Sequence, residues 1–403
     1  MAKGILQLKR VGGGMNKLIL AIETSCDETS VAVVRDGEIL SNVVFSQLDL
    51  HKAYGGVVPS IARVAHENKI NEVLKEALEV ANVALNQVTH IAVTQGPGLA
   101  IALEVGIRKA KELAAEYKLP LLGVNHMAGH LYSALDLKNA DWEFPALGLL
   151  VSGGHTEILV LEDLYSIRKV GQTLDDACGE AFDKFATMLG LEYPGGPQIS
   201  KLAGQSRSQL DIRLERDQQT LFVKGYAAGD EELKYQLPIP MANSGDLNMS
   251  YSGLKTAAKQ LINELSGVSH KLDIKQTGRA EKLTEEQIGE LCVMFEEAAL
   301  RTLVLKLEAA LKQFPAQELL LGGGVAASPR LRDLIAEFAT KSQVRFHIAP
   351  DRALLTDNAG MIGLAATVAL RQLEEQGKIS ENIAKLYNLN DFEQMDRMPG
   401  WDL

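Results

Sequence analysis

The sequence predicts an α/β protein in which two similar lobes face each other across a central cleft. The main observation is an order of elements that occurs twice: three strands followed by a helix, a strand, a helix, a strand and a helix. In both copies the first strand is apolar and a short polar turn follows it, which is typical of a β-hairpin. Glycine clusters lie between strands and helices, as they do where nucleotides bind. Two unrelated α/β domains are the alternative, which the repeated order disfavours.

The first lobe is expected at residues 17–135. Its strands are expected at 18–23, 30–34, 38–44, 90–94 and 120–124, and its helices at 66–80, 100–117 and 126–135. Asp36-Gly37 between two apolar runs predicts a tight hairpin turn. A C-terminal helix, within about 356–388, is expected to complete this lobe.

The second lobe is expected at residues 145–355. Its strands are expected at 146–151, 156–161, 166–170, 318–321 and 344–348, and its helices at 174–189, 253–265, 284–312 and 329–340. A polar segment at about 205–235 interrupts the repeated order. It is interpreted as either a surface insertion or a hairpin that docks a partner.

The composition limits the class of protein. The chain has 403 residues, enough for two cores, and its 46% hydrophobic content is that of an ordinary globular protein. Three cysteines far apart argue against a disulfide framework and favour a reducing compartment, the cytoplasm or an organelle. No apolar run is long enough for a membrane helix, so no membrane association is expected. Residues 1–16 lack the apolar core of a secretory signal and are interpreted as a disordered N-terminal extension.

The net charge of −11 does not indicate nucleic-acid binding by the chain as a whole. The segment 255–282 is the one stretch dense in lysine and arginine, and it is a candidate for contact with RNA. A solvated helical face explains such a run equally simply.

Two histidines, His126 and His130, are spaced four apart directly after an apolar strand. On a helix this spacing places both imidazoles on one face, where they can share a divalent cation. Zinc proteases also need a glutamate after the first histidine, and this chain has Met127 there. A third ligand must come from elsewhere, and Asp357 is a candidate. Its alternative role is an ordinary helix N-cap.

Three glycine-containing loops could approach an anion closely. They are Ser152-Gly153-Gly154, Gly322-Gly323-Gly324 before the helix that opens with Ser328-Pro329, and Gln95-Gly96-Pro97-Gly98. Plain turns are the alternative for the first and third. Asp183 lies at helical spacing from Asp176 and Glu180. These acids form either a solvated stripe or, at Asp183, an acceptor for sugar hydroxyls.

A series of motifs, in order from about residue 18 to about residue 370, resembles the TsaD / Kae / Qri family. The motifs are Ile22-Glu23-Thr24-Ser25-Cys26-Asp27-Glu28-Thr29, Gly55-Gly56-Val57-Val58-Pro59, Gly96-Pro97-Gly98, His126-Met127-Ala128-Gly129-His130, Leu150-Val151-Ser152-Gly153-Gly154-His155-Thr156, Gly179-Glu180-Ala181-Phe182-Asp183-Lys184, Tyr193-Pro194-Gly195-Gly196, Ser252-Gly253-Leu254-Lys255-Thr256 and Thr356-Asp357-Asn358. The resemblance implies an actin-like ATPase-domain fold (ASKHA, RNase H-like). It also implies transfer of threonylcarbamoyl from threonylcarbamoyl-AMP to N6 of the adenosine 3′ of the anticodon in tRNAs that read ANN codons.

The resemblance also implies roles for individual residues. His126, His130 and Asp357 look like ligands of one divalent metal per subunit, with Fe²⁺ expected and Zn²⁺ or Mg²⁺ as alternatives. Asp27 and Glu28 look like acids that act in the transfer. The expected adenylate-binding residues are Leu150, Val151, Ser152, Gly153, Gly154, Asp183, Gly196 and Ser328.

Two features depart from the family. Ser328 stands where asparagine is usual, so a contact to adenine or ribose there would be weaker. The segment at about 205–235 is longer than in typical bacterial members. The expected partners besides tRNA are a TsaB-like paralogue and a TsaE-like ATPase if the chain is bacterial, whereas organellar members resemble homodimers.

Competing functions come from other classes. An actin-like ATPase or sugar-kinase-like enzyme would share the lobes but would not need His126 and His130. A metalloprotease is disfavoured by Met127, which cannot serve as a general base. A non-catalytic scaffold would tolerate loss of the histidines and Asp357, and all three are present.

Overall fold

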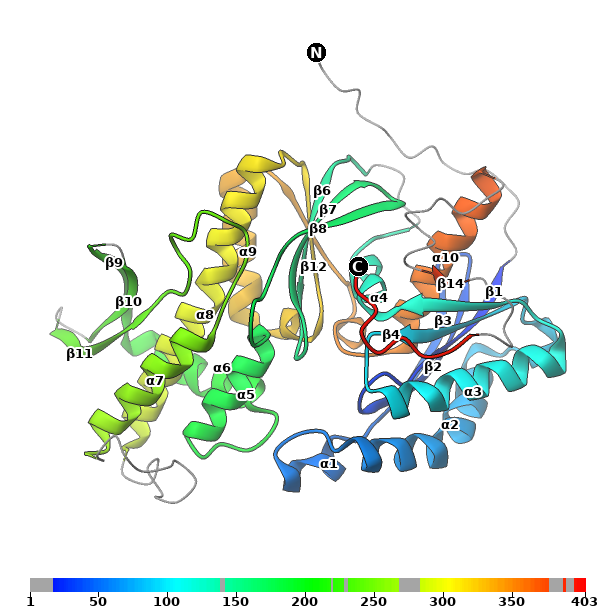
Figure 1. Ribbon diagram of the computed structural model, residues 1–403, viewed down its shortest axis with the longest axis horizontal. Coiled ribbons are helices and arrows are strands. Elements are labelled where there is room, and N and C mark those ends of the chain that lie inside the picture. The colour runs from blue at the N-terminus through cyan, green and yellow to red at the C-terminus, as the bar shows by residue number, and fades with distance from the viewer. Residues whose placement is uncertain are drawn as a thin grey trace, which may run out of the picture.

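The computed structural model describes residues 17–137, 142–218, 220–227, 231–267, 283–376, 387–388 and 395–403. The predicted N-terminal extension therefore lies outside the described residues, as does most of the basic segment 255–282. Figure 1 shows two large mixed sheets, one near the centre of the view and the other to its right, each with helices packed against it.

The first sheet has the strand order β14-β5-β4-β1-β2-β3. Its strands are β1 (Leu18–Glu23), β2 (Glu28–Arg35), β3 (Glu38–Ser46), β4 (His90–Gly96), β5 (Leu121–Asn125) and β14 (Tyr387–Asn388). The first three strands are antiparallel, whereas β4 and β5 run parallel to β1. Asp36 and Gly37 both have positive φ, as the predicted tight hairpin turn requires.

The second sheet has the order β13-β12-β6-β7-β8. Its strands are β6 (Ala146–Val151), β7 (Thr156–Asp163), β8 (Ser166–Gln172), β12 (Glu318–Gly322) and β13 (Arg345–Ile348). Three antiparallel strands are again followed by two parallel ones, so the second sheet repeats the first. The predicted duplication is confirmed at the level of strand order and direction.

The helices of the first lobe cover both faces of its sheet. They are α1 (Leu48–His51), α2 (Pro59–Ala81), α3 (Ala100–Tyr117), α4 (His126–Ser133) and α10 (Ala359–Gln376), with 3₁₀ turns at Lys52–Tyr54 and Leu85–Gln87. The prediction that a helix begins at residue 66 was wrong. α2 begins two turns earlier, because Pro59 has the backbone geometry of a first helical residue and needs no hydrogen-bond partner for its nitrogen.

The helices of the second lobe include one that the sequence analysis missed. They are α5 (Cys178–Met188), α6 (Gly195–Ser206), α7 (Ser252–Leu265), α8 (Glu285–Gln313) and α9 (Pro329–Ser342), with 3₁₀ turns at Arg207–Gln209, Gly324–Ala327 and Arg352–Leu354. α5 begins four residues later than predicted, so Asp176 precedes it and the expected acidic stripe is broken. α6 was missed because its first two residues are glycines, which are poor helix formers.

The segment that interrupts the second lobe forms a small antiparallel sheet of its own. Its strands are β9 (Asp211–Asp217), β10 (Thr220–Ala227) and β11 (Glu231–Pro238), in the order β11-β10-β9. Val223 and Leu237 are buried and join the core around α8. This sheet is therefore anchored to the lobe by apolar contacts.

The two lobes share one apolar core. A single buried cluster contains Ile19 from β1, Leu150 from β6 and Ala365 from α10. Met127 and Leu131 of α4 belong to the same cluster. α4 therefore lies where both sheets meet, which places its histidines at the junction of the lobes. None of the described helices is both long and apolar enough to cross a membrane.

The C-terminal segment 395–403 returns to the junction and lies close to α4 (Figure 1). The Met398 backbone N–H donates to the Gln95 carbonyl at 2.7 Å, and the Gly98 N–H donates to the Pro399 carbonyl at 3.2 Å. A Cβ atom at Gly96 would lie 1.8 Å from the Met398 carbonyl oxygen. The chain itself therefore covers one of the three glycine loops that the sequence analysis offered as an anion seat.

Candidate functional site

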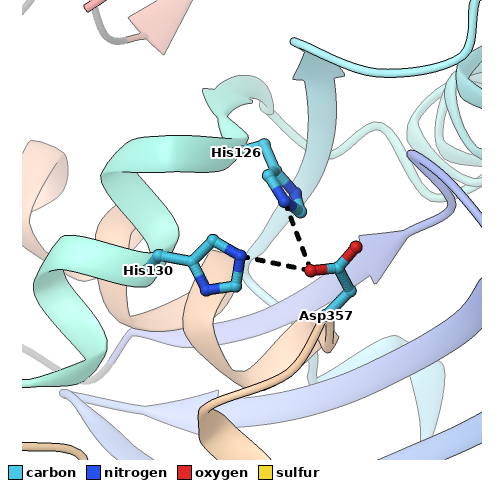
Figure 2. Close-up of side chains that lie close together, drawn as sticks. All are labelled: His126, His130 and Asp357. Atoms are coloured by element: carbon cyan, nitrogen blue, oxygen red, sulfur yellow. Dashed lines mark hydrogen bonds and ion pairs between the residues drawn. The ribbon is translucent and has the colours of Figure 1, made fainter. Parts of the chain in front are cut away.

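The two histidines of α4 and Asp357 point toward one another, although 227 residues separate His130 from Asp357 (Figure 2). His130 Nε2 lies 3.1 Å and His126 Nε2 lies 3.4 Å from the same Asp357 oxygen, Oδ1. The three potential ligand atoms all lie within 4.8 Å of one another. Such a cluster of two nitrogens and one oxygen matches the spacing of a metal centre.

Two helix caps place these side chains. The Asn125 side chain accepts from the N–H groups of Met127 and Ala128, so α4 begins at His126 and brings His130 onto the same face. At the start of α10 the Asn358 side chain accepts from the Met361 N–H at 3.0 Å. Asn358 therefore caps α10, and the carboxylate of Asp357 is left for the histidines.

Glu23, a residue to which the sequence analysis assigned no role, lies directly behind His126. Its Oε2 atom is 3.0 Å from His126 Nδ1 and accepts a hydrogen bond from the Thr94 hydroxyl at 2.5 Å. Its other oxygen accepts from the Ser25 N–H. A carboxylate at Nδ1 keeps the proton there and directs the Nε2 lone pair toward Asp357, as in carboxylate–histidine–metal arrangements.

The electrostatics of this cluster favour a cation. Burial lowers the pKa of His126, but the charges of Asp357 and Glu23 outweigh burial and raise it well above that of an ordinary histidine. Burial lowers the pKa of His130. Burial opposes ionisation of Asp357, yet both histidines hold its pKa far below the usual range. Because metal ions compete with protons for such ligands, a divalent cation can replace the proton on His126. Two imidazoles and a carboxylate suit Fe²⁺ or Zn²⁺.

Asp27 and Glu28 lie where β1 turns into β2, next to this cluster. The Ser46 hydroxyl donates to Glu28 Oε1 at 3.3 Å. Burial and the negative charges of Asp357 and Asp27 raise the pKa of Glu28 well above that of an ordinary glutamate. The acids of the first lobe and the predicted metal ligand therefore share one electrostatic environment.

A cavity of about 540 Å³ opens in the second lobe. Four of the eight predicted adenylate-binding residues line it: Gly153, Asp183, Gly196 and Ser328. The other lining residues are Gly179, Phe182, Tyr193, Pro194, Pro197, Ser200, Lys201, Gly324, Val325, Ala327 and Pro329. Its size and mixture of glycine, apolar and polar groups suit a small organic ligand.

The other four predicted residues do not line the cavity. Leu150 and Val151 are fully buried core residues of β6. Ser152 Oγ accepts from the N–H groups of Gly154 and His155 and so stabilises its own turn. The side chains of Leu150 and Val151 thus position the strand end that carries Gly153.

Glycines bring this turn close to the loop after β12. Gly323 has a φ of +90°, and a Cβ atom there would lie 2.5 Å from the Val151 carbonyl oxygen. Across the cavity, Asp183 Oδ1 accepts from the N–H of Gly195 at 2.8 Å and from that of Gly196 at 3.4 Å. Asp183 therefore fixes the start of α6 at the cavity wall.

Ser328 lies at the cavity and also begins α9. Its hydroxyl accepts from the Leu331 N–H at 3.3 Å, the N-cap role that the Ser-Pro pair predicts.

Lys255, a member of the predicted basic segment 255–282, forms an ion pair with Asp176.

The sequence contained one signal for a residue that was missed. Glu23 ends an otherwise apolar strand, and it is completely buried. A charged residue in such a place requires a partner, which is a reason to search for one. The hydrogen bond from the Asn125 side chain to the Trp401 carbonyl had no such signal, because 276 residues separate the two groups.

Comparison with known proteins shows a match over most of the chain. The family model of TsaD, tRNA N6-adenosine threonylcarbamoyltransferase, matches residues 38–364. A protein of that name from Bacillus thuringiensis (strain Al Hakam) is 41% identical over 365 residues, covering 90% of this chain and 93% of the relative. One from Bacillus subtilis (strain 168) is 40% identical over 358 residues, covering 88% of this chain and 91% of the relative.

Solved structures share the fold at low identity. The crystal structure of T. kodakarensis HypF superposes with a TM-score of 0.52 at 13% identity and covers 91% of this chain. Full-length HypF in a phosphate- and nucleotide-bound form gives 0.51, also at 13% identity, over 92% of this chain. This chain spans about half the length of HypF, 49% and 48% in the two structures. The likeness confirms the predicted fold class.

Proposed function

Since this chain belongs to the tRNA N6-adenosine threonylcarbamoyltransferase (TsaD) family, we propose that it forms threonylcarbamoyladenosine in tRNA. The donor is threonylcarbamoyl-AMP, and the acceptor is N6 of the adenosine 3′ of the anticodon in tRNAs that read ANN codons. The new bond joins N6 to the carbamoyl carbon, the bond from that carbon to the phosphate oxygen breaks, and AMP leaves with the electron pair. The proton of the amine goes to a base.

The observation that carries this proposal is the meeting of His126, His130 and Asp357 at the lobe junction. A kinase-like ATPase with the same lobes has no use for a two-histidine, one-carboxylate cluster there. A metalloprotease needs a general base next to the first histidine, and Met127 is buried and apolar. The cluster together with the cavity fits acyl transfer from an adenylate.

We propose one divalent metal per subunit, held by the cluster, with Fe²⁺ as the expected ion and Zn²⁺ or Mg²⁺ as alternatives. When bound, such an ion supplies a Lewis acid that polarises the carbamoyl group of the donor. Glu23 keeps the proton of His126 on Nδ1, so that Nε2 is available as a ligand.

The glycine loops of the second lobe are proposed to hold the AMP part of the donor. In this assignment Gly153 and Gly196 present backbone, while Asp183 and Ser328 present side-chain oxygens. Leu150, Val151, Ser152 and Gly154 support the loop that carries Gly153. The cavity is large enough for an adenylate. The threonylcarbamoyl end then extends toward His126.

Asp27 and Glu28 are proposed to accept the amine proton. A neutral exocyclic amine is a weak nucleophile, so positioning supplies much of the rate gain and the base removes the proton as the new bond forms. Burial and the charges of Asp357 and Asp27 raise the pKa of Glu28, so its carboxylate is a stronger base than that of an exposed glutamate.

We propose that the chain works with the partners of the bacterial family members, since the relatives described above come from Bacillus species. This proposal places the chain in the cytoplasm with tRNA, a TsaB-like paralogue and a TsaE-like ATPase. The proposed division is a first lobe at 17–135, completed by about 356–388, and a second lobe at 145–355 with an insertion at about 205–235. A homodimer able to act without partners would instead indicate the organellar type.

Incubation with threonylcarbamoyl-AMP and unmodified tRNA tests the function, with nucleoside mass spectrometry as the readout. Parallel reactions contain a chelator, or omit the two partner proteins. The modified nucleoside should form only with metal present, and His126→Ala with His130→Ala should abolish it without unfolding the chain. Normal modification by that double variant would exclude the proposed metal ligands.

A further inference from the structure

One imidazole lies beneath the turn that carries Asp27 and Glu28. His66, in the third turn of α2, is fully buried. Its Nε2 atom lies 3.0 Å from the Cys26 carbonyl oxygen, and its Nδ1 atom lies 2.7 Å from the Thr29 hydroxyl. Cys26 directly precedes the two acids and Thr29 directly follows them, so a single side chain holds both ends of the acidic pair.

These contacts determine the protonation of His66. A carbonyl oxygen can only accept, so Nε2 carries the proton and donates to Cys26. In the neutral ring Nδ1 is then an acceptor, and the Thr29 hydroxyl donates to it. Burial lowers the pKa of His66 and so favours this neutral form. A neutral ring adds no positive charge that would pair with the two acids.

The hydrogen bonds around His66 continue through Gln47 and His51 to the start of α2. The Gln47 side-chain nitrogen lies 3.1 Å from His66 Nδ1, and the Gln47 backbone N–H donates to the Asp27 carbonyl at 2.9 Å. His51 Nε2 lies 3.4 Å from Gln47 Oε1, and His51 Nδ1 accepts from the Val58 N–H at the start of α2. The turn is thus connected to α1 and α2 through the buried side chains of Gln47, His51 and His66.

Rigid attachment is needed here for an electrostatic reason. Asp27, Glu28 and Asp357 are three acids in one partly buried region, and their mutual repulsion favours any movement that separates them. In the described residues, contacts from His66 and Gln47 oppose that movement of the turn. Small displacements of a positioned group of about 1 Å can cost about 100-fold in rate.

We propose that His66 is a positioning residue for the transfer reaction: it holds the turn so that Asp27 and Glu28 face the acceptor amine. The proposal rests on the proposed role of these two acids. His66 acts on the turn through the Cys26 carbonyl and the Thr29 hydroxyl, the groups on either side of the two acids. Its loss should therefore change the rate of the chemical step and leave substrate and metal binding unchanged.

Three substitutions at one position test this inference in the full chain with its partners. His66→Gln keeps a donor at the reach of Nε2, whereas His66→Asn reaches only as far as Nδ1 and His66→Leu has neither group. We expect kcat to fall about 100-fold in His66→Leu, about as far in His66→Asn, and at most about 10-fold in His66→Gln. KM for threonylcarbamoyl-AMP and metal content should stay within about twofold of the wild type. His90→Leu, a histidine at the start of β4, is the matched control and should keep kcat.

A double-mutant cycle separates positioning from general destabilisation. If His66 acts through the acids, His66→Leu should cause little further loss of kcat in a Glu28→Gln background. The proposal is overturned if His66→Leu lowers kcat equally in the wild-type and Glu28→Gln backgrounds. A rise in KM would also overturn it, as would kcat values that simply follow thermal stability across the three variants. If His66→Leu fails to fold, the kcat values of His66→Gln and His66→Asn are compared instead. A kcat that is no higher in His66→Gln than in His66→Asn would then overturn the proposal.

The same experiment distinguishes failure of the inference from failure of the proposed function. A wild-type chain that makes no modified nucleoside contradicts the function itself. An active wild type with fully active Asp27→Asn and Glu28→Gln variants contradicts the role of the acids and therefore the positioning role. An active wild type that needs the acids but not His66 contradicts only the inference.

Discussion

At the scale of single residues, neighbouring positions carry different roles. Asp357 and the next residue, Asn358, are both good N-cap residues by type. Asn358 caps α10, and Asp357 is therefore available to His126 and His130. The sequence offered both roles for Asp357, and the position of the helix start decides between them.

Substitution of Glu23 tests the support behind His126. Glu23→Gln removes the negative charge at Nδ1 and should weaken metal binding about 10- to 100-fold, the usual effect of losing such a carboxylate. Competition with a chromogenic chelator measures the affinity. Glu79→Gln, an exposed acid on α2, serves as the control and should bind metal normally. Unchanged affinity in Glu23→Gln would show that the carboxylate does not orient the ligand.

The pKa of Glu28 predicts a pH-dependent effect on stability. The folded chain holds the Glu28 proton more tightly than the unfolded chain, so this residue's contribution to stability is present below the ordinary glutamate pKa. That contribution is lost as the pH rises through the raised folded value. In the presence of chelator, Glu28→Gln should therefore melt at a higher temperature than the wild type at pH about 8, and the difference should vanish near pH 4. Equal melting temperatures at both pH values would contradict the shift.

Ser328 is the departure from the family at the cavity, and it can be reversed. Ser328→Asn keeps an N-cap for α9, because asparagine caps as well as serine does, and adds an amide that reaches further into the cavity. We expect AMP to bind several-fold more tightly, equivalent to about 1 kcal/mol for one added hydrogen bond. Isothermal titration calorimetry measures the affinity.

The control for that experiment is Ser328→Ala, which loses the cap and should reduce the unfolding free energy by about 1 kcal/mol without improving AMP binding. Weaker AMP binding in Ser328→Asn than in the wild type would mean that the longer side chain obstructs the cavity.

At the scale of elements, the wrong boundaries have local causes. The predicted start of α2 is too late, because the buried Ala62 and Ala65 extend its apolar face toward Pro59, a regular helix-start signal. α6 opens with Gly195 and Gly196, whose low helix propensity concealed it. The hydrogen bonds from both glycines to Asp183 compensate for that low propensity. They come from another helix and are invisible to a local pattern.

Removal of the C-terminal residues 396–403 should destabilise the loop at Gly96 to Gly98. The deletion leaves the Gly98 N–H and the Gln95 carbonyl without their tail partners, each worth about 0.5–1.5 kcal/mol. We expect a lower melting temperature and faster amide hydrogen exchange at residues 95–98. Arg397→Ala, which removes only the exposed pair with Glu104, should cost less than about 1 kcal/mol. A truncated chain with wild-type stability and exchange would contradict the tail's packing role.

At the scale of the whole molecule, the ligand cluster lies beside the core that the two lobes share. His126 and His130 lie on a helix embedded in the core that both sheets share. Asp357 lies on the segment that leaves the second lobe for α10, which packs on the first sheet. A cation bound by all three residues therefore requires α4 and the start of α10 to lie in their native positions.

Cation binding should accordingly stabilise the whole chain. A ligand present at 100 times its Kd adds about 2.7 kcal/mol to the unfolding free energy if it binds only the folded state. Thermal melts with Fe²⁺ under anaerobic conditions, or with Zn²⁺, should show a metal-dependent rise in melting temperature. His130→Ala should show no rise. Stabilisation that persists in His130→Ala would place the cation elsewhere.

What the sequence determined by itself was local or repeated. The succession of strands along each lobe, the hairpin turn at Asp36-Gly37 and the cap at Ser328 follow from periodicity, turn chemistry and capping, which act over a few residues. The helical spacing of His126 and His130 is of the same kind. Asp357 was one candidate for a third ligand, the family motifs favoured it over a capping role, and the structure brings it within reach of both histidines.

Only the tertiary structure decided which buried groups serve these residues. Glu23 lies behind His126, His66 lies beneath the acids, and the C-terminal segment covers a glycine loop that looked available. Each contact joins residues that are at least 37 positions apart. Packing of the helices and the C-terminal segment on the first sheet brings such residues together, and no periodicity within either segment encodes the meeting.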